Sequence, residues 1–129
     1  MREIKFRAWD NETKSMIVNS TRKMTLQNGF DYGNPMFELM QYTGLKDKNG
    51  KEIYEGDILS FSIFDYNDND VQYKGVIVYS GSRFSIWNNK DSEYYGSDGG
   101  FDLDYTVSQD DELEIIGNIY ENKNIIEWI

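Results

Sequence analysis

A length of 129 residues fits one domain, and an aromatic content of 16% gives enough apolar surface for a folded core beside 28% charged residues. The formal net charge of -10 disfavours nonspecific binding to nucleic-acid phosphates, and the absence of cysteine and histidine excludes disulfides, thiolate nucleophiles and the commonest transition-metal ligands. The sequence shows no secretory signal and no apolar run that would span a membrane, so we expect a protein of the cytosol.

The first part of the chain, residues 1–45, is predicted to form an N-terminal β-hairpin lobe. Ile4, Phe6 and Ala8 alternate with charged residues, which is typical of a half-buried strand, and a polar turn follows at residues 11–14. The strand candidates of this part are residues 4–8, 16–18, 24–26 and 37–42.

The second part, residues 46–129, is predicted to form an SH3-like, partly open barrel, so that the fold class is mainly β. Its strand candidates are residues 58–63, 71–79, 83–87, 101–107 and 113–119. Consecutive antiparallel strands favour a barrel because closure removes exposed sheet edges. At the end of the chain Asn122 is predicted to cap a short helical turn that carries Ile125, Ile126 and Ile129. The two parts can also form one compact unit.

The stretch "YTGLKDKNGKEIYEGDIL", residues 42–59, contains two predicted structural turns. Asn49 and Gly50 form the strongest short turn pair, since both tolerate positive φ, and they predict a hairpin tip. Gly56 permits a sharp bend before a strand, and the carboxylate of Asp57 can accept backbone N–H bonds around that bend. We interpret Asp57 as a structural residue, with a catalytic role as the alternative.

No metal or catalytic site is predicted. The loop that starts at Asp47 places glycine at the fourth position of a calcium loop instead of the sixth, and the loop from Asp65 places Asp70 where that glycine is required. Asp102 and Asp104 would lie on one side of the predicted strand 101–107, a pattern that more often gives solubility than catalysis. We therefore predict no cofactor, no metal ion and no catalytic residue.

Three blocks of the sequence are "IKFRAWD" at residues 4–10, "YTGLKDKNGKEIYEGDIL" at residues 42–59 and "EIIGNIYEN" at residues 114–122. In their residues, order and approximate separation they resemble the signature blocks of the YopX family of phage and prophage proteins. The resemblance implies a small, mainly β protein encoded in a phage genome, with an SH3-like barrel in its C-terminal part. It implies no assigned activity and no catalytic residues.

If the middle block is a family signature, its tyrosines are expected to pack in a seam between the lobe and the barrel. A further hypothesis is that four residues of this region border a groove for a partner: Arg7, Trp9, Tyr42 and Tyr54.

Three functional classes follow from the sequence. The leading hypothesis is a non-enzymatic accessory protein of a phage, which binds another protein in the cytosol of the host cell, because an acidic surface suits a basic partner. The alternative is a nucleic-acid-binding module with exposed aromatics and with phosphate contacts from Arg2, Lys5 and Arg7. The third is a magnesium-dependent carboxylate enzyme. The sequence also leaves self-association into a homo-oligomer open.

Overall fold

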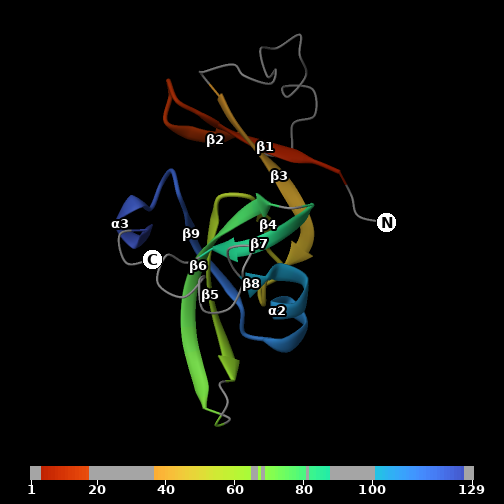
Figure 1. Cartoon of the computed structure of the whole chain (residues 1–129). Coiled ribbons are helices and arrows are strands. Elements are labelled where there is room, and N and C mark those ends of the chain that lie inside the picture. Colours follow the sequence, from red (N-terminus) through yellow and green to blue (C-terminus); the bar gives the residue numbers. More distant parts are fainter. Residues whose placement is uncertain are drawn as a thin grey trace.

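The computed structural model of the protein describes residues 4–17, 37–64, 67, 69–80, 82–87 and 101–126, and strands predominate among them (Figure 1). In chain order the elements are β1 (Phe6–Asp10), β2 (Ser15–Ile17), β3 (Phe37–Lys46), β4 (Glu52–Tyr54), β5 (Asp57–Phe64), β6 (Asp70–Ser80), β7 (Arg83–Trp87), β8 (Phe101–Asp102), α2 (Leu103–Gln109), β9 (Glu114–Asn118) and α3 (Lys123–Ile126).

The first sheet has the strand order β2-β1-β3-β4, with antiparallel pairing throughout. The predicted hairpin of β1 and β2 is confirmed, because Ala8 pairs with Ile17 across the turn at residues 11–14. The register between β3 and β4 shifts around Gly44, whose φ of 89° suits glycine. The sheet continues to Tyr54, so the predicted boundary between residues 45 and 46 falls inside β3.

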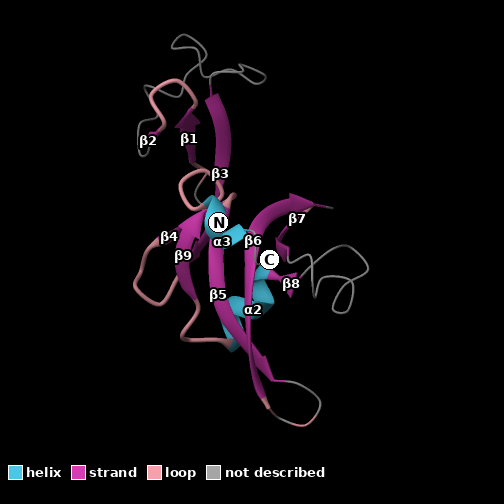
Figure 2. Ribbon diagram, turned by 90° about the vertical axis from the view of Figure 1, so that its left-hand side faces the viewer, coloured by secondary structure: helices cyan, strands magenta, loops and turns pink. Residues whose placement is uncertain are grey.

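The second sheet has the order β8-β7-β6-β5-β9 and curls into a half-barrel. Its antiparallel strands confirm a mainly β fold with a partly open barrel, whereas the SH3-like designation stays a prediction. Figures 1 and 2 show the ribbon of β5 and β6 at the opposite end of the molecule from β1 and β2. The protein is therefore elongated, and the two sheets meet near its middle.

One hydrophobic core lies on the inner face of the second sheet, and it takes residues from both sheets. Phe61 and Phe101 meet edge to face, with ring centroids 5.1 Å apart, and Ile53 of β4 is fully buried in the same cluster. The other buried members are Leu59, Ile77, Phe84, Ile86, Leu103 and Leu113. Because β4 belongs to the first sheet and Ile53 to this core, the two sheets fold as packed partners.

The structure corrects the prediction for residues 101–107, which are not a single strand. The strand ends at Asp102, and α2 follows at once because the Asp102 carboxylate accepts the N–H of Tyr105 at 3.2 Å and caps the helix. Asp102 and Asp104 therefore lie at the start of a helix and do not share a strand face. Cap chemistry outweighed the short-strand pattern.

A short helical turn near the C-terminus is confirmed as α3. The side-chain oxygen of Asn122, which was predicted to cap this turn, accepts the N–H of Asn118 at 3.1 Å, so it closes the preceding turn. Ile129 and the predicted strand 24–26 lie outside the described residues.

Candidate functional site

The turn between β4 and β5 is built by a glycine and a buried carboxylate. Gly56 has a φ of 84°, and its N–H donates to the carbonyl of Ile77 at 2.9 Å. The Oδ2 atom of Asp57 accepts the N–H of Tyr54 at 2.8 Å, which satisfies a buried backbone donor within the turn. Ile119 also donates its N–H to the carbonyl of Gly56, at 2.9 Å. This turn is therefore the point where β4, β6 and the end of β9 are tied together.

A buried ion pair joins β1 to this turn. The guanidinium Nη2 of Arg7 donates to Asp57 Oδ1 at 2.8 Å and to the carbonyl of Glu55 at 3.2 Å. Arg7 is 6% exposed and Asp57 is 2% exposed, so both charges are removed from water. Burial raises the pKa of the Asp57 carboxyl, and the nearby Arg7 charge and the N–H of Tyr54 oppose that rise.

Two tyrosine rings lie beside the ion pair, and each contacts a cationic side chain. The guanidinium of Arg7 lies 4.8 Å from the ring centre of Tyr54, and Lys5 lies 4.8 Å from that of Tyr42. The two rings are 5.4 Å apart, and Lys5 also forms an ion pair with Glu52. These contacts place the tyrosines of the middle block between β1, β3 and β4.

The four residues predicted to border a groove are all buried, between 4% and 7% exposed: Arg7, Trp9, Tyr42 and Tyr54. Trp9 stacks on Tyr120, with centroids 5.4 Å apart and planes 14° apart, at a separate place along β1. In this structure the four side chains pack between strands as a seam, and a contact with a partner stays a prediction.

The hairpin tip at Asn49 and Gly50 is held by Asp47, a role that was not predicted from the sequence. Asp47 Oδ1 accepts the N–H groups of Asn49 and Lys51, each at 2.9 Å, and Gly50 has a φ of 76°. The other carboxylate oxygen accepts the N–H of Ile115 on β9 at 3.1 Å. Asp47 is thus a buried joint between the β3–β4 hairpin and the second sheet, and its two carboxylate oxygens accept three backbone N–H groups.

A polar cavity of about 420 Å³ lies next to the ion pair, and residues of β1, β2, β5 and β9 line it. Its described lining includes Arg7, Asp57, Lys51 and Glu121. The Nε atom of Arg7 and the hydroxyl of Tyr54 are buried without a hydrogen-bond partner. Within the described ranges, no group of three or more acidic side chains is arranged to hold a metal ion.

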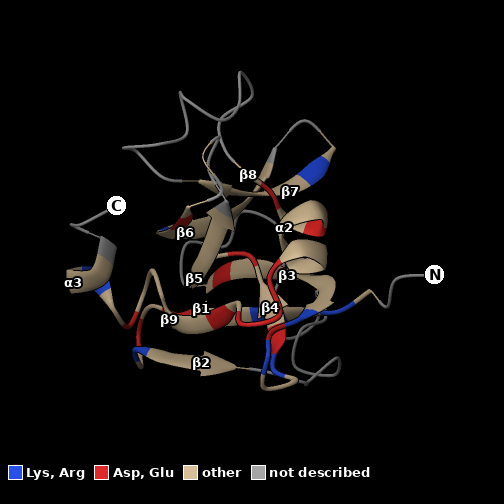
Figure 3. Ribbon diagram, turned by 90° about the horizontal axis from the view of Figure 1, so that it is seen from below, with Lys and Arg blue, Asp and Glu red and all other residues tan. Residues whose placement is uncertain are grey.

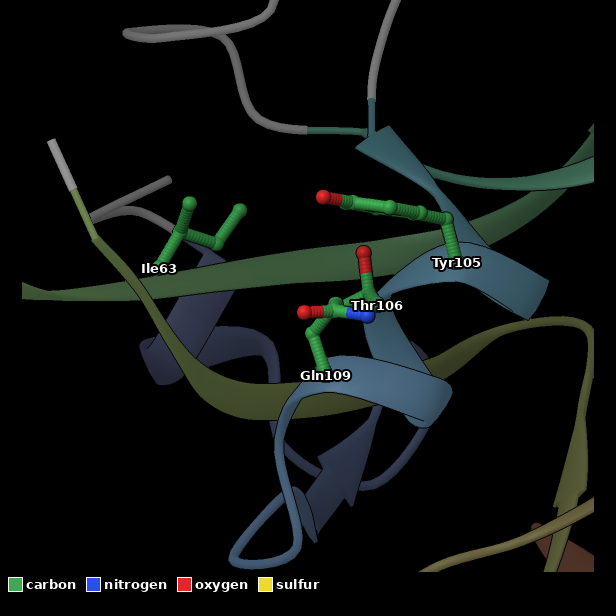
Figure 4. Close-up of a pocket in the computed structure, with 4 residues that line it drawn as sticks. All are labelled: Ile63, Tyr105, Thr106 and Gln109. Carbon is green, nitrogen blue, oxygen red and sulfur yellow. The ribbon is translucent and has the colours of Figure 1, made fainter. Parts of the chain in front are cut away.

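A second cavity, of about 140 Å³, opens between α2 and β5 and was missed by the sequence analysis. Its described lining is Ile63, Tyr105, Thr106 and Gln109. Figure 4 shows Tyr105 and Gln109 reaching from α2 toward the side of the cavity that holds Ile63. We call this cavity the α2–β5 groove. The signal that would have found α2 is Asp102 followed by Leu103 and Val107 at helical spacing.

The fold and the seam define a class: a small protein of two packed β-sheets, joined by buried carboxylates that bind backbone N–H groups and an arginine. The family model described as YopX protein matches residues 5–127. The chain therefore belongs to the YopX family.

A solved structure is similar to this chain along nearly its whole length. The crystal structure of protein EF1440 from Enterococcus faecalis is 25% identical, with a TM-score of 0.56, and the match covers 98% of this chain and 99% of that one. The search of the curated proteins found no match. None of the described helices has the length and apolar character needed to cross a membrane.

Proposed function

We propose that this protein is a phage-encoded accessory protein that acts without catalysis in the host cytosol, by binding a basic segment of another protein. The observation that carries the proposal is that two N-terminal cations form ion pairs with acidic side chains of the same chain. Arg7 is paired with Asp57 inside the fold, and Lys5 is paired with Glu52. These two cations are therefore not available for a basic patch, and because each pair also uses one acid, the surplus of 23 acidic over 13 basic residues is unchanged.

The same observation gives no support to the nucleic-acid alternative. That alternative relied on Arg2, Lys5 and Arg7 for phosphate contacts. Lys5 and Arg7 are engaged in ion pairs, and Arg2 lies outside the described residues. An acidic surface attracts a basic protein and raises its association rate, with an effect that weakens as salt is added.

We include the absence of catalysis in the proposal because the buried carboxylates hold backbone turns. Asp47 and Asp57 are the charged acids with the least access to solvent among the described residues, and both bind backbone N–H groups. A carboxylate that is needed to hold a turn is a poor candidate for a general base, because proton transfer would break the turn.

The test is affinity capture from infected cells with the tagged protein. The captured material is divided in two, and one half is washed with nuclease before elution. We expect a basic protein to be retained after nuclease treatment and to be released by salt. Retention of nucleic acid alone, or loss of every protein on nuclease treatment, would contradict the proposal.

A further inference from the structure

The α2–β5 groove has the size of a single apolar side chain. Its volume of about 140 Å³ is close to that of a protein cavity that holds one benzene ring, about 150 Å³, and well below that of a drug-sized site. Ile63 is a partly buried residue packed on the core, next to the cluster of Phe61, Tyr73 and Phe101. A phenylalanine or leucine side chain that entered here would extend an existing apolar cluster.

Tyr105 is the described side chain that stands out at this place. It is 61% exposed, the highest value among the exposed aromatic side chains that the structure describes. Among the described tyrosines, the others each contact a second ring, whereas Tyr105 makes no ring or cation contact. An exposed tyrosine beside an apolar cavity is typical of a binding surface, since its ring offers area with little conformational entropy to lose.

The chain segment that contains α2 is acidic. Residues 101–122 contain no lysine and no arginine, and Figure 3 shows acidic positions on α2 and on the segment that leads to it from β8. The acidic residues of this range are Asp102, Asp104, Asp110, Asp111, Glu112, Glu114 and Glu121. Lys48 reaches the far side of this region, where it pairs with Glu112 at 3.6 Å and Glu114 at 3.8 Å.

A hydrogen bond joins the two walls of the groove. Asp110, directly after α2, accepts the N–H of Ser62 on β5 at 2.8 Å. Within α2 the hydroxyl of Thr106 donates to the carbonyl of Asp102 at 2.8 Å, which holds the first turn of the helix. A wall that is held in place before binding loses little conformational entropy when a ligand binds.

We propose that the α2–β5 groove binds a lysine- or arginine-rich peptide segment of a partner protein through one apolar anchor residue. The anchor enters between Ile63 and Tyr105, and the flanking cations face the carboxylates of residues 102–112. This inference rests on the proposed function and gives it a place on the molecule. The chemistry of the occupant follows from charge complementarity, because an acidic peptide would be repelled from the same surface.

The probe is a short fluorescent peptide with one phenylalanine between pairs of lysines. The control is the same peptide with glycine in place of phenylalanine. Binding is measured by fluorescence anisotropy with the whole protein at low salt. We expect saturable binding of the phenylalanine peptide, about tenfold weaker binding of the glycine peptide, and a further fall in affinity as salt is raised.

Two matched variants locate the site. Tyr105→Ser should weaken binding of the phenylalanine peptide about fivefold or more, while Tyr79→Ser, at a tyrosine that is 50% exposed at the β6–β7 hairpin, should leave it unchanged. Thermal unfolding of both variants checks that each is folded. We expect a small change in stability for Tyr105→Ser and a larger one for Tyr79→Ser, because the ring of Tyr79 contacts Phe84 with centroids 4.9 Å apart.

The outcomes separate the two proposals. Binding that depends on phenylalanine but is unaffected by Tyr105→Ser overturns the placement in the groove and leaves a basic partner as the proposed function. Failure of both lysine peptides to bind at low salt contradicts the groove and the basic partner together, and so does the capture from cells of a partner that has no basic segment.

Discussion

Replacing Asp57 by alanine should destabilise the protein strongly, because this side chain serves two buried donors. The substitution removes the acceptors of the Arg7 guanidinium and of the Tyr54 N–H, each at 2.8 Å. Removing one partner of a buried ion pair costs about 3–5 kcal/mol, since the other charge stays out of water. Arg7 keeps its bond to the Glu55 carbonyl at 3.2 Å and its contact with the Tyr54 ring, so we expect the lower end, about 3 kcal/mol.

The assay is equilibrium unfolding in urea, followed by far-UV circular dichroism. With an m-value of about 2 kcal/mol/M, the midpoint of Asp57→Ala should fall by about 1.5 M. Asp111→Ala is the control, because Asp111 is an exposed acid, and its midpoint should differ by less than about 0.3 M.

A double variant separates the charge from the turn. Arg7→Met together with Asp57→Asn removes both charges and keeps an oxygen for the N–H of Tyr54, so it should lose less stability than the two single variants added together. An Asp57→Ala midpoint within about 0.3 M of the parent would refute the reasoning. If that variant also lost its partner, the turn would belong to the binding surface.

Three further predictions concern the same stretch. Gly56→Ala should cost more stability than Gly50→Ala in urea unfolding, because both positions have positive φ but only the Cβ at position 56 would crowd a side chain, the sulfur of Met40 at 3.1 Å; equal losses would contradict this. Asp47→Ala should cost about 2 kcal/mol in the same assay, since three N–H groups lose their acceptor, and a loss below about 0.5 kcal/mol would contradict its role as a joint. Because burial raises the pKa of Asp57, the stability of the parent protein should fall as pH rises from about 4 through that pKa. The stability that Asp57→Asn loses relative to the parent should therefore shrink between about pH 4 and pH 7. A loss that grows over this range would show that the attraction of Arg7 exceeds the effect of burial.

Alternation of apolar and polar residues was enough to predict β5, β6 and β7, although Ser85 on the polar side of β7 is buried like Phe84 and Ile86. The hairpin turns could be predicted because Asn49 and Gly50 favour that geometry wherever they occur. Local patterns of this kind depend on neighbours in the sequence, which the sequence itself shows.

The seam and the groove depend on residues far apart in the chain, and local patterns do not report such distances. Arg7 and Asp57 are separated by 50 positions, and nothing in the two strands marks them as partners. The groove was missed for a different reason. Its helix was read as a strand, since Phe101 and Leu103 alternate with Asp102 and Asp104, and the helical cap of Asp102 decides between the two readings.

We propose that the α2–β5 groove binds the partner and that the middle block holds the fold. Amide chemical shifts, mapped during titration with the phenylalanine peptide, test this most directly. We expect the shift changes to concentrate in β5 beyond Ser60, in α2 and in residues 110–112, while the amide shifts of Arg7, Tyr54 and Asp57 stay unchanged. Changes that concentrate at the Arg7–Asp57 pair, with the groove unaffected, would contradict it.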